Sequence, residues 1–100
     1  MVLSAFFGFY LMIKALWVSS KGVSSSKIGD ELALLQPASG QYFTLNQTGA
    51  IVWQLLEEPH STDEIALAVA EKYDISASEC QDDIGEIIVR LGDAGLVQKA

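Results

Sequence analysis

The spacing of apolar residues along residues 21–100 changes near Asn46 from the period of a strand to that of a helix. Before Asn46, short apolar runs are separated by turn residues such as Gly29 and Pro37. These runs predict strands at 23–28, 31–36 and 41–44. Consecutive strands joined by short turns usually pair with each other, so we expect an antiparallel meander with the third strand at its edge.

The second half of the chain carries helical periodicity with recognisable start signals. Asn46 is a suitable N-cap, and Ser61 with Glu64 and Ser76 with Glu79 have the spacing of capping boxes. Helices are expected at about 47–57, at 62–73, and from 77 to Gly92 or Gly95. The predicted fold is therefore α+β and winged-helix-like: a three-stranded antiparallel β-meander followed by a three-helix bundle, with Leu96 and Val97 packing back on the sheet.

Residues 1–20 form an apolar N-terminal extension in front of the domain predicted at 21–100. The run at 1–18 is short for a membrane span and carries Lys14. It admits three interpretations: a packing or dimerising segment, an extension upstream of a true start at Met12, or a membrane contact. The packing interpretation places one set of residues on a single helical face: Leu3, Phe6, Phe7, Tyr10, Ile13 and Trp17.

The charge balance argues against a nucleic-acid partner. The chain has a formal net charge of -7, and its six basic residues are scattered rather than clustered. Such a surface repels phosphate backbones. The single cysteine, Cys80, cannot form an internal disulfide, so we expect a reducing, cytoplasmic compartment.

Catalytic and metal-binding patterns are missing from the sequence. His60 is the only histidine, so a zinc site has too few soft ligands and a nucleophile has almost no base to pair with. We interpret His60 as a solvent-exposed residue and Cys80 as a buried structural one. No glycine-rich phosphate loop occurs. We therefore expect a protein that is not an enzyme and that needs no cofactor and no metal.

Several motifs in order resemble the PqqD family over about Ile28 to Val97. They are Gly40-Gln41-Tyr42-Phe43-Thr44-Leu45-Asn46, then Gly49, Trp53, Leu55 and Leu56, then Ser61-Thr62-Asp63-Glu64-Ile65, Tyr73-Asp74, Asp83-Ile84, Leu91 and Gly95-Leu96-Val97. The resemblance implies a peptide chaperone in the biosynthesis of modified peptides, including PQQ. Such a domain holds the leader of a ribosomally made precursor and presents the precursor to a modifying enzyme, commonly a radical-SAM protein.

In this family the leader adds as a strand beside the third β-strand, in a groove that the last helix closes. Carried onto this chain, the resemblance implies one set of peptide-binding residues: Gln41, Tyr42, Phe43, Thr44, Leu45, Asp83, Glu86, Ile87 and Arg90. Tyr42 and Phe43 point to opposite faces, so one should line the groove and the other should enter the core. Ile87 or Ile88 would form the floor. An acidic rim would favour a peptide carrying Lys or Arg; it consists of Asp82, Asp83 and Glu86.

Two other functions fit the same order of elements. A winged-helix regulator would bind DNA, but its recognition helix would need basic residues, and the last helix offers Arg90 against several acids. A purely structural subunit would use residues 1–18 as a homodimer interface.

Overall fold

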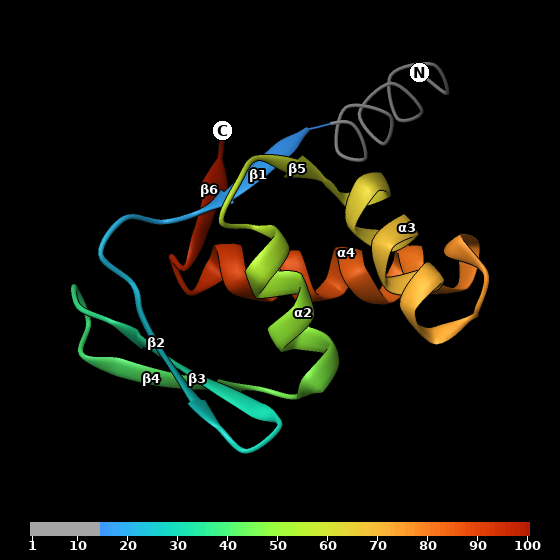
Figure 1. Ribbon diagram of the computed structural model, residues 1–100. Coiled ribbons are helices and arrows are strands. Elements are labelled where there is room, and N and C mark those ends of the chain that lie inside the picture. The colour runs from blue at the N-terminus through green and yellow to red at the C-terminus, as the bar shows by residue number, and fades with distance from the viewer. Residues whose placement is uncertain (1–14) are drawn as a thin grey trace.

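The computed structural model describes residues 15–100, so most of the apolar face expected at the N-terminus, from Leu3 to Ile13, lies outside the described residues. The strands are β1 (Leu16–Ser19), β2 (Ser24–Ile28), β3 (Glu31–Gln36), β4 (Gln41–Leu45), β5 (His60–Ser61) and β6 (Val97–Lys99). The helices are α2 (Gln47–Leu55), α3 (Thr62–Tyr73) and α4 (Ala77–Asp93). In Figure 1, α2 and α4 cross the middle of the molecule with one small sheet above them and another below.

The lower sheet is the predicted meander, with strand order β2-β3-β4 and antiparallel pairing throughout. Its boundaries agree with the sequence prediction to within one residue at each end. The β3–β4 turn is closed by Gly40, whose N–H donates to the Gln36 carbonyl at 2.8 Å. Gly40 has a φ of 71°, a conformation that costs glycine little because it has no Cβ. The winged-helix-like α+β class is confirmed.

The upper sheet was not predicted from the sequence. Its order is β5-β1-β6, so β1 is central and pairs antiparallel with both short neighbours. The helical prediction for Trp17 was therefore wrong, because Trp17 lies in β1 opposite His60 and Lys99. His60 is half-buried rather than exposed, and its Nδ1 lies 2.7 Å from the Leu55 carbonyl. The segment at Leu96 and Val97 is buried as expected, but Val97 begins a strand of this sheet rather than packing on the meander.

The helix ends follow the capping chemistry of the sequence. The Asn46 side chain accepts from the Gly49 N–H at 2.9 Å, and Ser61 forms a complete capping box with Glu64. At Ser76 only half of the predicted box is present: the hydroxyl accepts from the Glu79 N–H, without a return bond from the Glu79 side chain. α4 ends in a Schellman motif around Gly95.

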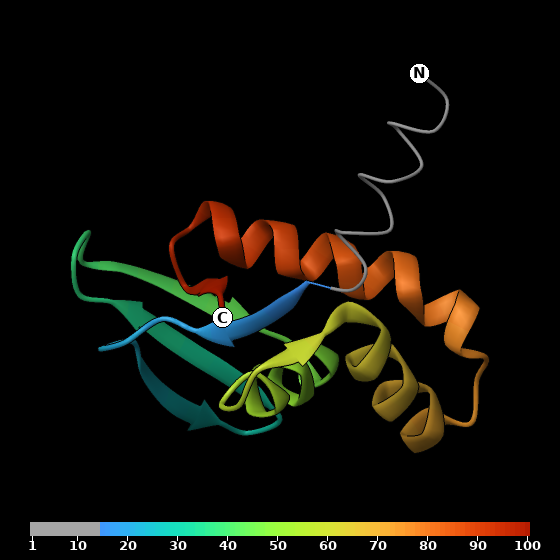
Figure 2. The same ribbon diagram turned by 90° about the horizontal axis from the view of Figure 1, so that it is seen from above.

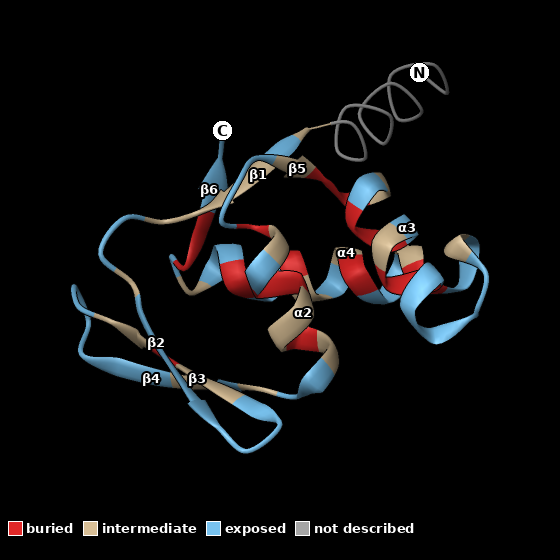
Figure 3. Ribbon diagram, viewed as in Figure 1, coloured by how far each residue is buried: buried red, intermediate tan, exposed pale blue. Residues whose placement is uncertain are grey.

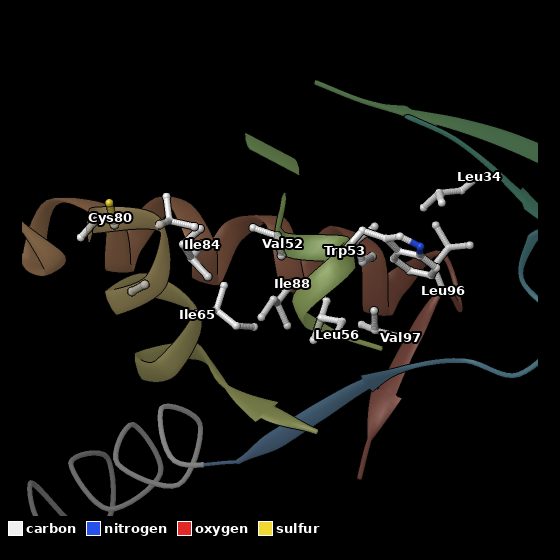
Figure 4. Close-up of a cluster of buried hydrophobic side chains, with 14 residues drawn as sticks. Leu34, Val52, Trp53, Leu56, Ile65, Cys80, Ile84, Ile88, Leu96 and Val97 are labelled. Atoms are coloured by element: carbon white, nitrogen blue, oxygen red, sulfur yellow. The ribbon is translucent and has the colours of Figure 1, made fainter. Parts of the chain in front are cut away.

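The core lies between the helices and the inner face of the meander (Figures 3 and 4). Its largest fully buried side chains come from β3, all three helices and the segment before β6: Leu34, Val52, Leu56, Ile65, Ile84 and Leu96. Trp53 and Cys80 are also buried, as predicted. Leu34 is the single fully buried residue of the meander and joins that sheet to the helices. No helix within residues 15–100 combines the length and apolar character needed to cross a bilayer.

Candidate functional site: the groove beside strand β4

Strand β4 is an open sheet edge. Within residues 15–100 it pairs with β3 alone, through a register in which Leu34 faces Phe43 and Leu32 faces Leu45. The other side of an edge strand presents alternate N–H and C=O groups without ladder partners. These groups can bond to an added strand. Seen from above, green β4 lies on the side of its sheet nearest α4, and β2 lies on the opposite side (Figure 2).

A cavity of about 330 Å³ lies between β4 and α4. We call it the apolar cavity because most of its lining is hydrophobic. The lining residues are Phe43, Thr44, Leu45, Asn46, Gly49, Ile87, Arg90, Leu91 and Leu96. A volume of this size is at the lower end of the range for ligand sites and can hold one large side chain. The strand edge and the cavity are therefore adjacent, which is the arrangement that binding of an extended peptide requires.

A second cavity of about 300 Å³ continues the groove past the end of β4. It is lined by Asn46, Thr48, Asp83, Glu86, Ile87 and Arg90, and we call it the acidic cavity. Arg90 donates to Glu86 at 3.1 Å, and both side chains are well exposed. Because Asn46, Ile87 and Arg90 line both cavities, the two are parts of one groove.

Most of the predicted site residues meet in this groove, but two do not. Phe43, Thr44, Leu45, Asp83, Glu86, Ile87 and Arg90 line it. Tyr42 is 72% exposed on the outer face of the sheet, and Gln41 stands next to the hairpin turn outside both cavities. We expected one of Tyr42 and Phe43 to line the groove and the other to enter the core. This expectation is wrong, since Phe43 both lines the cavity and packs against the core. The part of each residue in binding stays a prediction.

The groove floor and rim can be assigned more narrowly than the sequence allowed. Ile87 lines both cavities, whereas Ile88 is buried in the core, so Ile87 is the floor residue. Asp83 and Glu86 line the acidic cavity, but Asp82 does not. Five lining residues were not predicted: Asn46, Thr48, Gly49, Leu91 and Leu96. The N-cap signal at Asn46 placed that residue at the corner between β4 and α2, where the apolar cavity meets the acidic one.

The corner between β4 and α2 depends on a close backbone approach at Gly49. A Cβ at this position would lie 3.0 Å from the Leu45 Cβ and 3.4 Å from the Asn46 Oδ1. A Cβ contact of 3.0 Å is tighter than nine in ten real ones, so a larger residue would force Leu45 to shift. Gly49 thus positions the lining of the apolar cavity through its small size.

A larger cavity of about 480 Å³ lies elsewhere, between β1 and the helices α3 and α4. Its lining includes Leu16, Asp63 and Leu67. Two strands border it: β1 is already paired on both sides, and β5 is only two residues long. A two-residue edge cannot pair with a useful length of peptide, so we assign the candidate site to β4.

The fold and this groove define a winged-helix-like domain with an open strand edge facing a helix. Residues 31–97 match the family model described as coenzyme PQQ synthesis protein D (PqqD). The chain therefore belongs to the PqqD family, and the resemblance noted from its motifs is confirmed. None of the curated proteins matches the chain significantly.

Solved structures share the fold over most of the chain. TbiB1, in complex with the TbiA(beta) leader peptide, is 31% identical with a TM-score of 0.74, covering 81% of this chain and 94% of that one. A lasso peptide synthetase B1, complexed with the leader peptide, is 24% identical with a TM-score of 0.71, covering 82% and 96%. The PqqD part of Methylobacterium extorquens PqqCD, a stand-alone recognition element for ribosomally synthesised, post-translationally modified peptides, is 19% identical with a TM-score of 0.70, covering 83% and 88%.

Proposed function

We propose that this chain is a leader-peptide recognition domain. It binds the leader of a ribosomally made precursor peptide as an added strand along β4 and holds it in the groove against α4. The observation that carries the proposal is the coincidence of an open strand edge with an apolar cavity on the same side of β4. Main-chain bonds to the edge supply affinity, and the cavity selects a side chain.

The relatives support the same ligand class. TbiB1, which is 31% identical over most of its length, was solved with a leader peptide, and a lasso peptide synthetase B1 of the same fold was solved with one as well. Three further features are proposed without support from these relatives: the lack of catalysis, the compartment and the modifying enzyme. The domain is non-catalytic, works in the cytoplasm, and presents the bound precursor to a separate modifying enzyme, in the first instance of the radical-SAM class.

The alternative functions fit the molecule less well. A DNA-binding winged helix would present basic residues on α4, but the groove side of α4 carries Asp83 and Glu86. For the dimer, residues 16–18 lie in β1, which is already paired on both sides within the chain, so they offer no free strand edge. Residues 1–14 of that segment lie outside the described residues.

The proposal is tested by selecting a random dodecapeptide display library on the immobilised full-length protein, since this probe assumes no leader sequence. An enriched peptide is then synthesised and titrated into ¹⁵N-labelled protein. We expect amide shifts along β4 and along α4 from Asp83 to Arg90, and none along β1, β5 and β6. Absence of enrichment, or shifts confined to other elements, would overturn the proposal.

Strand addition itself is tested on the peptide rather than on the protein, which avoids variants that fail to fold. The enriched peptide is made in two N-methylated forms, methylated at one of two adjacent central positions. In an added strand, one of these N–H groups faces β4 and the other faces solvent. We expect one form to lose binding and the other to keep it. Equal affinity of both forms would exclude pairing along the edge.

A further inference from the structure

The groove beside β4 changes character along its length. Near Phe43 and Leu45 its lining is apolar, and past the end of β4 it is flanked by Asp83 and Glu86. Ile87 stands at the boundary and lines both cavities. A peptide lying along β4 therefore meets an apolar cavity first and an acidic one next, in the direction in which β4 itself runs.

The distance between these two environments can be read from the helix that forms one wall. Asp83 and Ile87 are four residues apart on α4, so they share a face with an axial separation of about 6 Å. In an extended peptide, side chains on one face recur every second residue, at a spacing of about 6.6 Å. Figures 1 and 2 show β4 and α4 running roughly alongside each other, so one turn of α4 matches one two-residue step of a strand bound along β4.

We infer that the groove selects a leader with a large apolar residue and, two positions away toward the α2 end of the groove, a Lys or Arg. The apolar residue fills the apolar cavity and the cation lies against Asp83 and Glu86. This inference rests on the proposed function, because it assumes that an extended peptide lies along β4. The long stem of Lys or Arg can pack on Ile87 while its charge reaches the acids.

The two acids differ in how available they are. Glu86 is already paired with Arg90 at 3.1 Å. Asp83 is exposed and has no ion pair within residues 15–100. Asp83 is therefore the principal contact for a peptide cation, because the Arg90 guanidinium already occupies part of the Glu86 carboxylate. The net charge of -7 on the chain adds a general attraction for basic peptides.

The experiment uses the display-selected peptide, with its apolar anchor located by alanine scanning. Four variants carry a single Lys one or two positions before or after the anchor, so they share composition and net charge. We expect one of the two-position peptides to bind about two- to fivefold more tightly than both one-position peptides, the range for exposed ion pairs. The difference should shrink as salt is raised, because these charges are exposed.

Protein variants separate a specific contact from general charge attraction. Asp83→Asn should remove the preference for the two-position Lys. Asp82→Asn is the matched control, because Asp82 is its exposed neighbour on α4 and lies outside both cavities. Asp82→Asn removes the same charge as Asp83→Asn but should keep the preference for the two-position Lys. Arg90→Met, which retains an aliphatic stem but frees Glu86, should strengthen binding of the two-position peptide.

A wrong motif and a wrong function give different experimental results. If all four Lys peptides bind equally while the N-methylation test still shows strand pairing, the inferred motif is wrong and the leader-binding function stands. The motif is also wrong if Asp82→Asn abolishes the preference as completely as Asp83→Asn. If neither N-methylated form loses binding, the proposed function itself falls.

Discussion

The two small sheets of this domain have three strands each and differ in almost every other respect. The β2-β3-β4 sheet is built from neighbouring hairpins and leaves β4 with an open edge beside a groove. The β5-β1-β6 sheet joins residues 16–19, 60–61 and 97–99, and its longest strand is paired on both sides. One sheet offers backbone groups to a partner, whereas the other uses its backbone to hold the chain together.

This difference bears on how a small domain can expose an edge strand without pairing indiscriminately. An open edge invites unspecific pairing unless it is short or flanked. Here β4 has five residues and ends at once in the cap of α2, so an added strand has a defined length and position. The second sheet adds no comparable edge, because β1 is paired on both sides and its two neighbours have only two and three residues.

The largest expected effect concerns the side chain that ties the open sheet to the helices. Leu34→Ala removes a fully buried side chain of β3 and should destabilise the protein by about 2–5 kcal/mol. Leu35→Ala is the matched control on the outer face of the same strand, where the residue is half-buried, and should cost clearly less. Urea unfolding of both variants measures the difference. Equal losses would mean that the two faces of the sheet are not distinct.

A smaller effect is expected from removing the backbone hydrogen bond that joins the closed sheet to the end of α2. The Ser19 N–H donates to the Leu56 carbonyl at 2.8 Å. Ser19→Pro removes this donor and should cost about 1–3 kcal/mol. Ser19→Ala keeps the donor and should stay within about 0.5 kcal/mol of the parent protein in thermal or urea unfolding. If the two variants were equally stable, this hydrogen bond would contribute nothing to the stability of the protein.

The smallest loss of stability is expected from removing the helix N-caps, and the two caps should differ in their effect on peptide binding. Both sheets lead straight into a capped helix, β4 through Asn46 and β5 through Ser61. Asn46→Ala and Ser61→Ala should each cost about 1 kcal/mol of stability. Only Asn46→Ala should also lower the affinity for the selected peptide, because Asn46 lines both cavities of the groove. Equal peptide affinities, measured by fluorescence anisotropy, would show that this corner does not shape the site.

The sequence predicted the meander, the three helices and most of their caps, because these depend on signals within a few residues. Gly29 and Gly40 mark the turns, and Asn46 and Ser61 mark the helix starts. The second sheet gave no such signal: its strands have two to four residues, and their partners lie far away in the chain. Trp17 was assigned to a helix for that reason.

The site was predicted unevenly for a similar reason. β4 followed from the local strand pattern, and the facing helix followed from the family resemblance together with its apolar period. The outward direction of Tyr42 and the inclusion of Leu96 depend on how β4, α4 and the chain after α4 pack in three dimensions. Alternation along β4 separates Tyr42 from Phe43 but does not say which face meets the core.

The pairing of β1 with β6 has a practical meaning for how the domain can be joined to other proteins. The Ala100 N–H donates to the Leu16 carbonyl at 2.9 Å, so the two ends of the described chain leave from one spot. Figure 1 shows this spot across the molecule from β4. A fusion partner or a surface tether attached after Ala100 would therefore leave the groove accessible.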